Sequence, residues 1–287
     1  MSKPAPWSSP QGQMILVFDG LWLVGLALLW APGSLAAVAL LHRSAETVGW
    51  PQAGLLVPLA YLVFLFVTAF CVGVLGFLLP RPAEGSARVF RDRAFFVFLL
   101  HWGLESALPR PLITHIQLLT SLRTMYYNLM GAKLGWSSHI SPGATISGAA
   151  LLEMGHLTYI GEGAHIATHL SQGNKVLLAP VKLGDGTNVG AHCHIGPGSS
   201  FARDVRIGAL CDVAPGCWIE DEVEIGPSCQ LGMGVKVGAG STLEPRSFVP
   251  SWSVVPAGEV WGGDPAKKLR DADLGPGAER RRKRRRG

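Results

Sequence analysis

Two long apolar stretches occupy the first third of the chain. Residues 54–79 form 26 consecutive positions without a charged side chain, and residues 20–41 form 22, interrupted by Pro32 and Gly33. Each stretch is long enough to cross the hydrocarbon core of a bilayer as a helix. Membrane helices also tolerate proline and glycine better than soluble helices do. The pattern therefore predicts a hairpin of two transmembrane helices over residues 14–80.

The charges around these stretches predict their orientation. Four arginines follow the second stretch, whereas the loop between the stretches holds only Arg43 against Glu46. Basic residues are enriched on the cytoplasmic side of membrane proteins, so both chain ends are expected in the cytoplasm, at the cell inner membrane. A signal peptide is the alternative for the first stretch. Against it, there is no basic region beyond Lys3 in the N-terminal segment 1–13, no small-residue cleavage site is found, and a second span follows at once.

Residues 81–133 stay apolar but are interrupted by charged residues, histidines and prolines too often for a third span. Short helices at the membrane interface are expected here, with Trp102, Tyr126 and Tyr127 at the depth of the lipid headgroups. A soluble linker subdomain is the alternative. The segment is thus predicted to be a helical linker between the membrane hairpin and the second half of the chain.

A six-residue period governs the second half of the chain. Every sixth residue from Leu183 to Val249 is large and apolar, and the position two before each of them is small or β-branched. Upstream, the period runs from Leu134 to Leu152 and resumes at Ile160 after a slip of two residues. Repeats of this kind are typical of solenoids. Two inward positions in six residues describe one flat side of a triangular coil, so the pattern predicts a parallel β-helix over residues 134–271.

Two segments of this region depart from the period. It lapses over residues 170–182, which predicts a loop extruded from the solenoid, and it ends near Pro250, so that residues 259–271 are expected to fold back as a cap. Four of the five cysteines occupy the small inward position, where a thiol behaves as a compact apolar group. They are Cys193, Cys211, Cys217 and Cys229. The cysteines are therefore expected to be reduced core residues without a catalytic role.

The repeat resembles that of the left-handed β-helix (hexapeptide-repeat) acyltransferases. Members of that family place a catalytic histidine just before an extruded loop, which corresponds here to His169, and re-enter the coil with a sequence similar to residues 180–184. Their C-terminal Gly-x-Pro-Ala-Lys signature is matched by Gly263, Pro265, Ala266 and Lys267. The resemblance implies a left-handed β-helix joined to the membrane hairpin, and an acyltransferase activity.

The whole chain is similar to one membrane-bound unit of the C-terminal region of ε-poly-lysine synthetase-type peptide synthetases, in which paired transmembrane helices alternate with acetyltransferase-like domains. That resemblance implies a homotrimer, because three such units occur on one synthetase chain and homo-oligomers prefer closed symmetry. The same resemblance is compatible with two acyl donors, acyl-CoA and the phosphopantetheine thioester of a carrier protein. The transferred acyl or aminoacyl group and the acceptor stay undetermined.

The chemistry of acyl transfer suits a histidine. Moving an acyl group from a thioester to an amine or a hydroxyl needs a base of near-neutral pKa, which His169 would supply. Glu153 or His165 could orient it or contact the acceptor. The family resemblance implies that the donor lies in a groove between subunits, near Gly190, and contacts the region of Lys267 at its far end. No metal is expected at this site.

Two further function classes are open. γ-Class carbonic anhydrases share the expected fold and bind a metal between subunits through three histidines, and His192 and His194 could be mistaken for such ligands. However, these two residues are expected to point in different directions, and the family's Gly-His then His-Gly-Cys arrangement is missing. Alternatively, the β-helix is a scaffold without catalytic activity.

Charge excludes one class of partner. The formal net charge of +5 comes from a tail in which residues 280–286 are all basic, and it would be −2 without them. A nucleic-acid-binding surface needs basic residues spread over the fold, so nucleic acid is not an expected partner. The tail, residues 272–287, is expected to be disordered and to rest on anionic membrane lipids.

Overall fold

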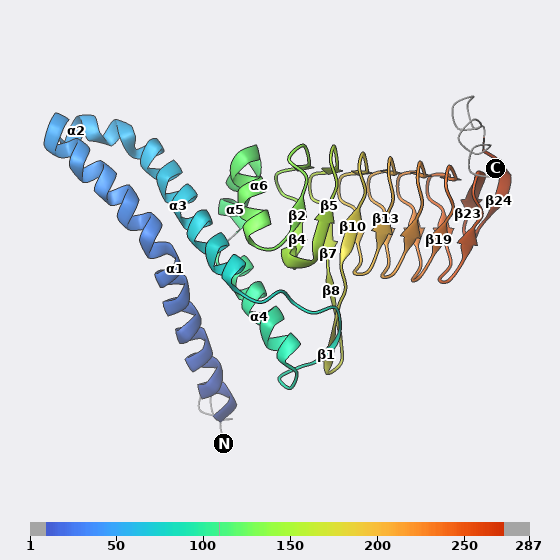
Figure 1. Ribbon diagram of the computed structural model, residues 1–287, viewed down its shortest axis with the longest axis horizontal. Helices are drawn as coiled ribbons and strands as arrows, with labels where there is room; N and C mark the ends of the chain where they lie inside the picture. Colours follow the sequence, from blue (N-terminus) through green and yellow to red (C-terminus); the bar gives the residue numbers. More distant parts are fainter. Residues whose placement is uncertain (1–9, 109, 273–287) are drawn as a thin grey trace, which may run out of the picture. The chain divides into compact units, whose positions relative to one another are not determined.

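The computed structural model describes residues 10–108 and 110–272 (Figure 1). Most of the N-terminal segment and nearly all of the basic tail lie outside the described residues, and so does the expected contact of the tail with lipid. The chain divides into two compact units, Met1–Val74 and Leu75–Gly287. The boundary between them falls near the end of the second apolar stretch.

The first unit is helical. It contains α1 (Pro10–Val48), α2 (Trp50–Ala53), the 3-10 helix η2 (Gly54–Leu56) and most of α3 (Val57–Leu78). By length and composition, the helical stretches Asp19–Val48 and Trp50–Leu78 are both able to cross a membrane. They coincide with the two apolar stretches of the sequence.

The two long helices pack closely at one point within this unit. Helix α1 continues through Pro32, and Gly33 lies against α3. A Cβ atom at Gly33 would lie only 2.7 Å from the carbonyl oxygen of Phe64 and would overlap the hydroxyl of Thr68. Glycine is therefore required where the helix backbones approach each other.

The second unit is built on a parallel β-solenoid whose sides are three sheets. The seven-stranded sheet contains β2 (Lys133–Leu134), β5 (Leu152–Met154), β10 (Val181–Leu183), β13 (Ser200–Phe201), β16 (Trp218–Ile219), β19 (Lys236–Val237) and β22 (Val254–Val255). The eight-stranded sheet contains β3 (His139–Ile140), β6 (Tyr159–Ile160), β11 (Asn188–Val189), β14 (Arg206–Ile207), β17 (Glu224–Ile225), β20 (Thr242–Leu243), β23 (Glu259–Gly263) and β24 (Ala266–Asp271). The six-stranded sheet contains β4 (Thr145–Ser147), β7 (His165–Ala167), β12 (His194–Ile195), β15 (Asp212–Val213), β18 (Gln230–Leu231) and β21 (Phe248–Val249).

The register confirms the parallel β-solenoid predicted from the period. From β10 onward, paired residues of neighbouring coils are 18 positions apart, as in the pair Asn188 and Arg206. The periodic apolar residues from Leu152 to Val249 are buried, and so are the small residues two positions before them from Thr187 onward. Many of the latter bond to a carbonyl 15 residues ahead; the Cys193 thiol, for example, donates to Gly208 at 3.0 Å. The inward thiols and hydroxyls thus satisfy turn carbonyls inside the coil.

The segment expected as an extruded loop is an ordered hairpin. Strands β8 (His169–Gln172) and β9 (Lys175–Leu178) pair antiparallel, and β1 (Gly85–Arg88) adds to β9 as a third strand. A small core forms where this sheet meets α4 (Arg93–Ser106); its buried members are Ala87, Phe95, Phe98, Val176 and Leu178. The linker therefore contributes a strand and is not purely helical.

The linker helices belong to the solenoid unit. Helices α5 (Arg110–Leu118) and α6 (Thr120–Leu129) lie beside the first coil, and α4 lies beside β1, as Figure 1 shows. Tyr126 and Tyr127 are only 1% and 4% exposed, so the prediction that they lie at lipid headgroup depth is wrong. The physical reason is that a solenoid's open end leaves its apolar interior uncovered, and these side chains cover it. Trp102 is 45% exposed, and for this residue the prediction stays untested.

Buried polar contacts fix these helices to the first coil. The guanidinium of Arg123 donates to the carbonyls of Gln117 at 3.2 Å and Ser138 at 2.8 Å, and lies 3.1 Å from Nδ1 of His139. At the opposite end of the solenoid, β23 and β24 form an antiparallel hairpin at the place where the sequence expects a cap. The last coil thus ends in a hairpin that extends the eight-stranded sheet.

Candidate active site

His169 marks the point where the chain leaves the solenoid. It is the first residue of β8 and follows β7 of the six-stranded sheet after a single residue, Thr168. The Thr168 hydroxyl contacts the carbonyls of Ser147 at 3.0 Å and Gly148 at 2.9 Å, and its N–H also donates to Ser147. These bonds hold the departure point against the preceding coil, so the position of His169 is set by the solenoid.

The surroundings of His169 keep its imidazole neutral. Its ring centroid lies 4.8 Å from that of Phe98 on α4, and its Nδ1 atom is buried with no hydrogen-bond partner among the described residues. Burial lowers the pKa of His169, and the nearby backbone of Ser147 opposes this effect only in part. A neutral imidazole at pH 7 is able to accept a proton, which is the requirement for a general base.

Glu105, which was not among the predicted site residues, approaches the same turn from α4. Its carboxylate accepts hydrogen bonds from the N–H groups of Gly148 at 2.9 Å and Ala149 at 2.6 Å. These are the N-cap and first residue of the 3-10 helix η3 (Ala149–Leu151), where free N–H groups attract anions. Burial nevertheless raises the pKa of Glu105 to about 7, because the desolvation outweighs both bonds. The available signal was an acidic residue within an otherwise apolar helical segment.

Gly148 is approached by both side chains: Glu105 bonds to its N–H, and His169 lies close to its Cα. Its φ is +88°, and a Cβ atom there would overlap the Thr168 hydroxyl and lie 3.9 Å from Nδ1 of His169. Only glycine fits this conformation and this space at low cost. The turn is therefore narrow enough for a carboxylate and an imidazole to reach it from different elements.

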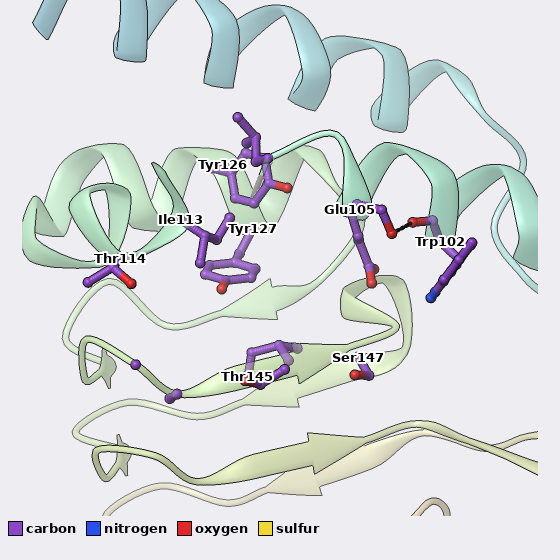
Figure 2. Close-up of a pocket in the computed structure, with 13 residues that line it drawn as sticks. Trp102, Glu105, Ile113, Thr114, Tyr126, Tyr127, Thr145 and Ser147 are labelled. Carbon is purple, nitrogen blue, oxygen red and sulfur yellow. Dashed lines mark hydrogen bonds between the residues drawn. The ribbon is translucent and has the colours of Figure 1, made fainter. Parts of the chain in front are cut away.

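A cavity of about 420 Å³ opens beside this turn, between the linker helices and the first coil (Figure 2). Glu105 and Trp102 of α4, Tyr126 and Tyr127 of α6, and Ser147 of β4 contribute to its lining. The Tyr127 hydroxyl accepts a hydrogen bond from Gln117 at 3.2 Å, whereas the Tyr126 hydroxyl is buried without a partner among the described residues. The cavity thus combines aromatic rings with a carboxylate and hydroxyls.

The structure brings only one of the two proposed orienting residues near this region. His165 lies on β7, and its Nε2 is 3.0 Å from the hydroxyl of Ser147, which lines the cavity. Glu153 lies on the seven-stranded sheet, where it pairs with Lys133 at 2.7 Å and Lys182 at 3.9 Å. No contact between Glu153 and His169 is present in the described part of the chain.

The residues predicted to bind the cofactor lie on the eight-stranded sheet. Gly190 borders a groove of about 440 Å³ that extends along this sheet to Glu244. Gly263, Pro265, Ala266 and Lys267 belong to the C-terminal hairpin, whose strand β23 neighbours β20 in the same sheet. A Cβ atom at Gly190 would lie 2.6 Å from the backbone nitrogen of Ala209, so glycine is needed there for coil stacking alone. This groove and His169 are on different sheets of one chain.

The histidines of the metal-site alternative point to different neighbours. His192 is at a turn with φ +55°, with its ring over Gly163, whereas the ring of His194 packs edge-on to His165 at 5.7 Å. Within residues 10–108 and 110–272 there is no group of three or more His, Cys, Asp or Glu side chains that could hold a metal ion.

The raised pKa of Glu105 predicts a pH-dependent stability. An acid whose folded-state pKa exceeds its unfolded value stabilises the fold below the unfolded value, and this contribution is lost as pH rises through the folded one, here about 7. The melting temperature of the wild type should therefore fall relative to that of Glu105→Gln between pH 5 and pH 8. Thermal unfolding of both proteins across this range measures the difference. If the two melting temperatures differed by the same amount at every pH, the raised pKa of Glu105 would be contradicted.

Comparisons with known proteins show similarity of fold only. No protein-family model matches the chain, and no curated protein matches it either. Among solved structures, a Bacillus cereus protein described as an acetyltransferase is 22% identical with a TM-score of 0.39, covering 54% of this chain and 84% of its own. A mutant of AntD, an N-acyltransferase from Bacillus cereus in complex with dTDP and coenzyme A, is 12% identical with a TM-score of 0.46, covering 59% and 97%. A hexapeptide-repeat acetyltransferase of Vibrio cholerae complexed with acetyl coenzyme A is 16% identical with a TM-score of 0.40, covering 64% and 92%.

Proposed function

We propose that this protein is an acyltransferase that moves an acyl group from a thioester to an amine or a hydroxyl, with His169 as the general base. One observation carries the proposal: the Nδ1 atom of His169 is buried without a partner among the described residues, at the point where the solenoid opens into a hairpin. Burial also lowers the pKa of this imidazole. A buried ring nitrogen without a partner is costly unless a ligand or water satisfies it. An acceptor group would do so.

The reaction requires one proton to move twice. The acceptor nitrogen or oxygen attacks the thioester carbonyl carbon, and His169 takes the proton that this atom loses as the new C–N or C–O bond forms. The C–S bond then breaks, and the sulfur takes the proton from His169 and leaves as a free thiol. The histidine is neutral again at the end, so each turnover yields one acylated acceptor and one thiol.

The donor is proposed to be acyl-CoA or a carrier-protein phosphopantetheine thioester. The resemblance of Gly263 to Lys267 to the hexapeptide-family signature supports this choice, and so does the groove beside Gly190, which extends toward that hairpin. Since the groove and His169 are on different sheets, a complete site would form where the groove of one subunit meets the histidine of another.

We therefore also propose a homotrimer held in the cell inner membrane, with both termini cytoplasmic. Exposed apolar side chains on the solenoid support assembly; they include Leu157, Leu210, Trp218, Trp252 and Val254. The lengths and apolar surfaces of Asp19–Val48 and Trp50–Leu78 support membrane insertion. Mass photometry of detergent-solubilised protein should give three copies, and a fully active monomer would contradict the shared site.

Binding of the donor is the experiment that separates this function from the alternatives. Purified protein in detergent should bind CoA, and treatment with a chelator should leave the binding unchanged. Isothermal titration with CoA, before and after chelation, makes the measurement. Activity that is lost with the chelator and restored by zinc would favour the carbonic-anhydrase type of site, and a protein that binds neither CoA nor a carrier thioester would favour a scaffold.

A further inference from the structure

The cavity between the linker helices and the first coil carries chemistry that acyl transfer by His169 does not explain. In Figure 2 the side chain of Glu105 extends from α4 toward the strand that carries Ser147, and the rings of Tyr126 and Tyr127 lie beside it. Its volume of about 420 Å³ is within the range of small-molecule sites. Its polar groups suggest which chemical class of molecule it holds.

Tyr126 provides the first indication of a ligand. The side chain is 1% exposed, lines the cavity and packs edge-on against the ring of Tyr127 at 5.2 Å. Its hydroxyl is buried and has no partner among the described residues. A buried hydroxyl without a hydrogen bond costs stability, so its retention here points to a partner that enters the cavity.

Glu105 provides the second indication. Each of its oxygens accepts one backbone N–H, from Gly148 and Ala149, and a carboxylate has about four acceptor positions. Tyr126 and Tyr127 of α6 line the same cavity, while the guanidinium of Arg123 is held by the carbonyls of Gln117 and Ser138. No basic side chain in the described residues forms an ion pair with Glu105. Half of its acceptor capacity is thus left for a ligand.

We propose that this cavity binds the primary ammonium group of the acceptor, through Glu105 and the Tyr126 hydroxyl, with the aromatic rings of Trp102 and Tyr127 around it. An ammonium group has three N–H donors, which the Glu105 carboxylate and the Tyr126 hydroxyl are able to accept. Aromatic faces also attract cations. An alcohol has one donor and lacks the charge that a carboxylate favours. The assignment of this ligand as acceptor depends on the proposed function, whereas its binding does not.

The position of the cavity suits this role. Glu105 and His169 reach the same turn at Gly148, so an amine held by Glu105 lies on the side of the turn next to the proposed base. The bound ammonium gives one proton to solvent before attack, and the Glu105 carboxylate then accepts a hydrogen bond from the neutral amine. The cavity is therefore an acceptor site formed by the linker and the first coil, separate from the groove of the eight-stranded sheet.

Binding of n-butylamine and n-butanol to the full-length protein, without CoA, tests the inference. The amine should bind more tightly than the alcohol, and Tyr126→Phe should weaken amine binding about tenfold, the effect of one charge-assisted hydrogen bond. Tyr126→Phe removes a hydroxyl that has no partner among the described residues, so folding should not suffer. Glu105→Gln should weaken amine binding further. The matched control is Tyr159→Phe, which makes the same change at a hydroxyl bonded to Ser141 on the solenoid.

Two results would overturn the inference. One is equal binding of the amine and the alcohol, and the other is amine binding that neither Tyr126→Phe nor Glu105→Gln weakens. The variant His169→Ala separates this inference from the proposed function, because it should bind n-butylamine normally and lose turnover. Retained turnover in His169→Ala together with normal amine binding would remove the proposed base and leave the ammonium site in place.

Discussion

Replacement of His169 by alanine is expected to lower the rate of acyl transfer by about two to four powers of ten, the range typical for loss of a general base. Burial lowers the pKa of this imidazole, which favours the neutral form that is able to accept the proton. The loss should be in kcat, with CoA binding unchanged, because His169 acts on the proton of the acceptor and is not among the residues that line the groove.

The matched control for this variant is His156→Ala. The His156 side chain is exposed and its hydrogen bond to Asp185 comes from the backbone N–H, so the substitution should leave activity unchanged. The pH dependence of the wild-type rate gives a second readout. Activity should fall as pH drops below the lowered pKa of His169, since the protonated ring no longer accepts a proton. Full activity in His169→Ala would exclude His169 as the base.

The largest expected effect on stability is that of Phe201→Ala, about 3–5 kcal/mol of unfolding free energy. Phe201 is 2% exposed and occupies an inward position of β13 in the middle of the seven-stranded sheet. Its removal would leave a cavity in a coil whose neighbours are fixed by the hydrogen bonds of adjacent turns, so the structure relaxes little. Chemical denaturation followed by circular dichroism gives the change.

Phe248→Ala is the matched control for this prediction. Phe248 is in the outward position of β21, is 36% exposed, and precedes the inward Val249. The same substitution there should cost well under half as much, because less apolar surface leaves water on folding. Equal losses in the two variants would mean that the solenoid register is wrong.

The inward and outward positions of the solenoid could be predicted because they depend on local periodicity. One residue in six must be large and apolar whatever the rest of the chain does, so Phe201 and Cys193 were assigned to the interior from spacing alone. The departure of the chain at His169 was visible for the same reason, as a break in the period.

The structure of the linker could not be predicted in this way. Strand β1 pairs with β9 across a sequence separation of roughly ninety residues. The local pattern of residues 85–88 does not indicate which strand they pair with. Tyr126 and Tyr127 resemble interfacial aromatics in composition, but their burial depends on the open end of the coil that they cover. Glu105 was missed because its function depends on the turn at Gly148, which is more than forty residues away.

Acyl transfer to an amine is tested most directly by detecting the acylated product with mass spectrometry. Purified full-length protein is incubated with acetyl-CoA and n-butylamine, and both N-butylacetamide and free CoA thiol are quantified over time. With His169 as the base, the two products should appear in equal amounts, at a rate that falls by about two to four powers of ten in His169→Ala and is unchanged in His156→Ala. Thiol release without acylated amine, or product formation at the same rate in His169→Ala, would contradict this mechanism.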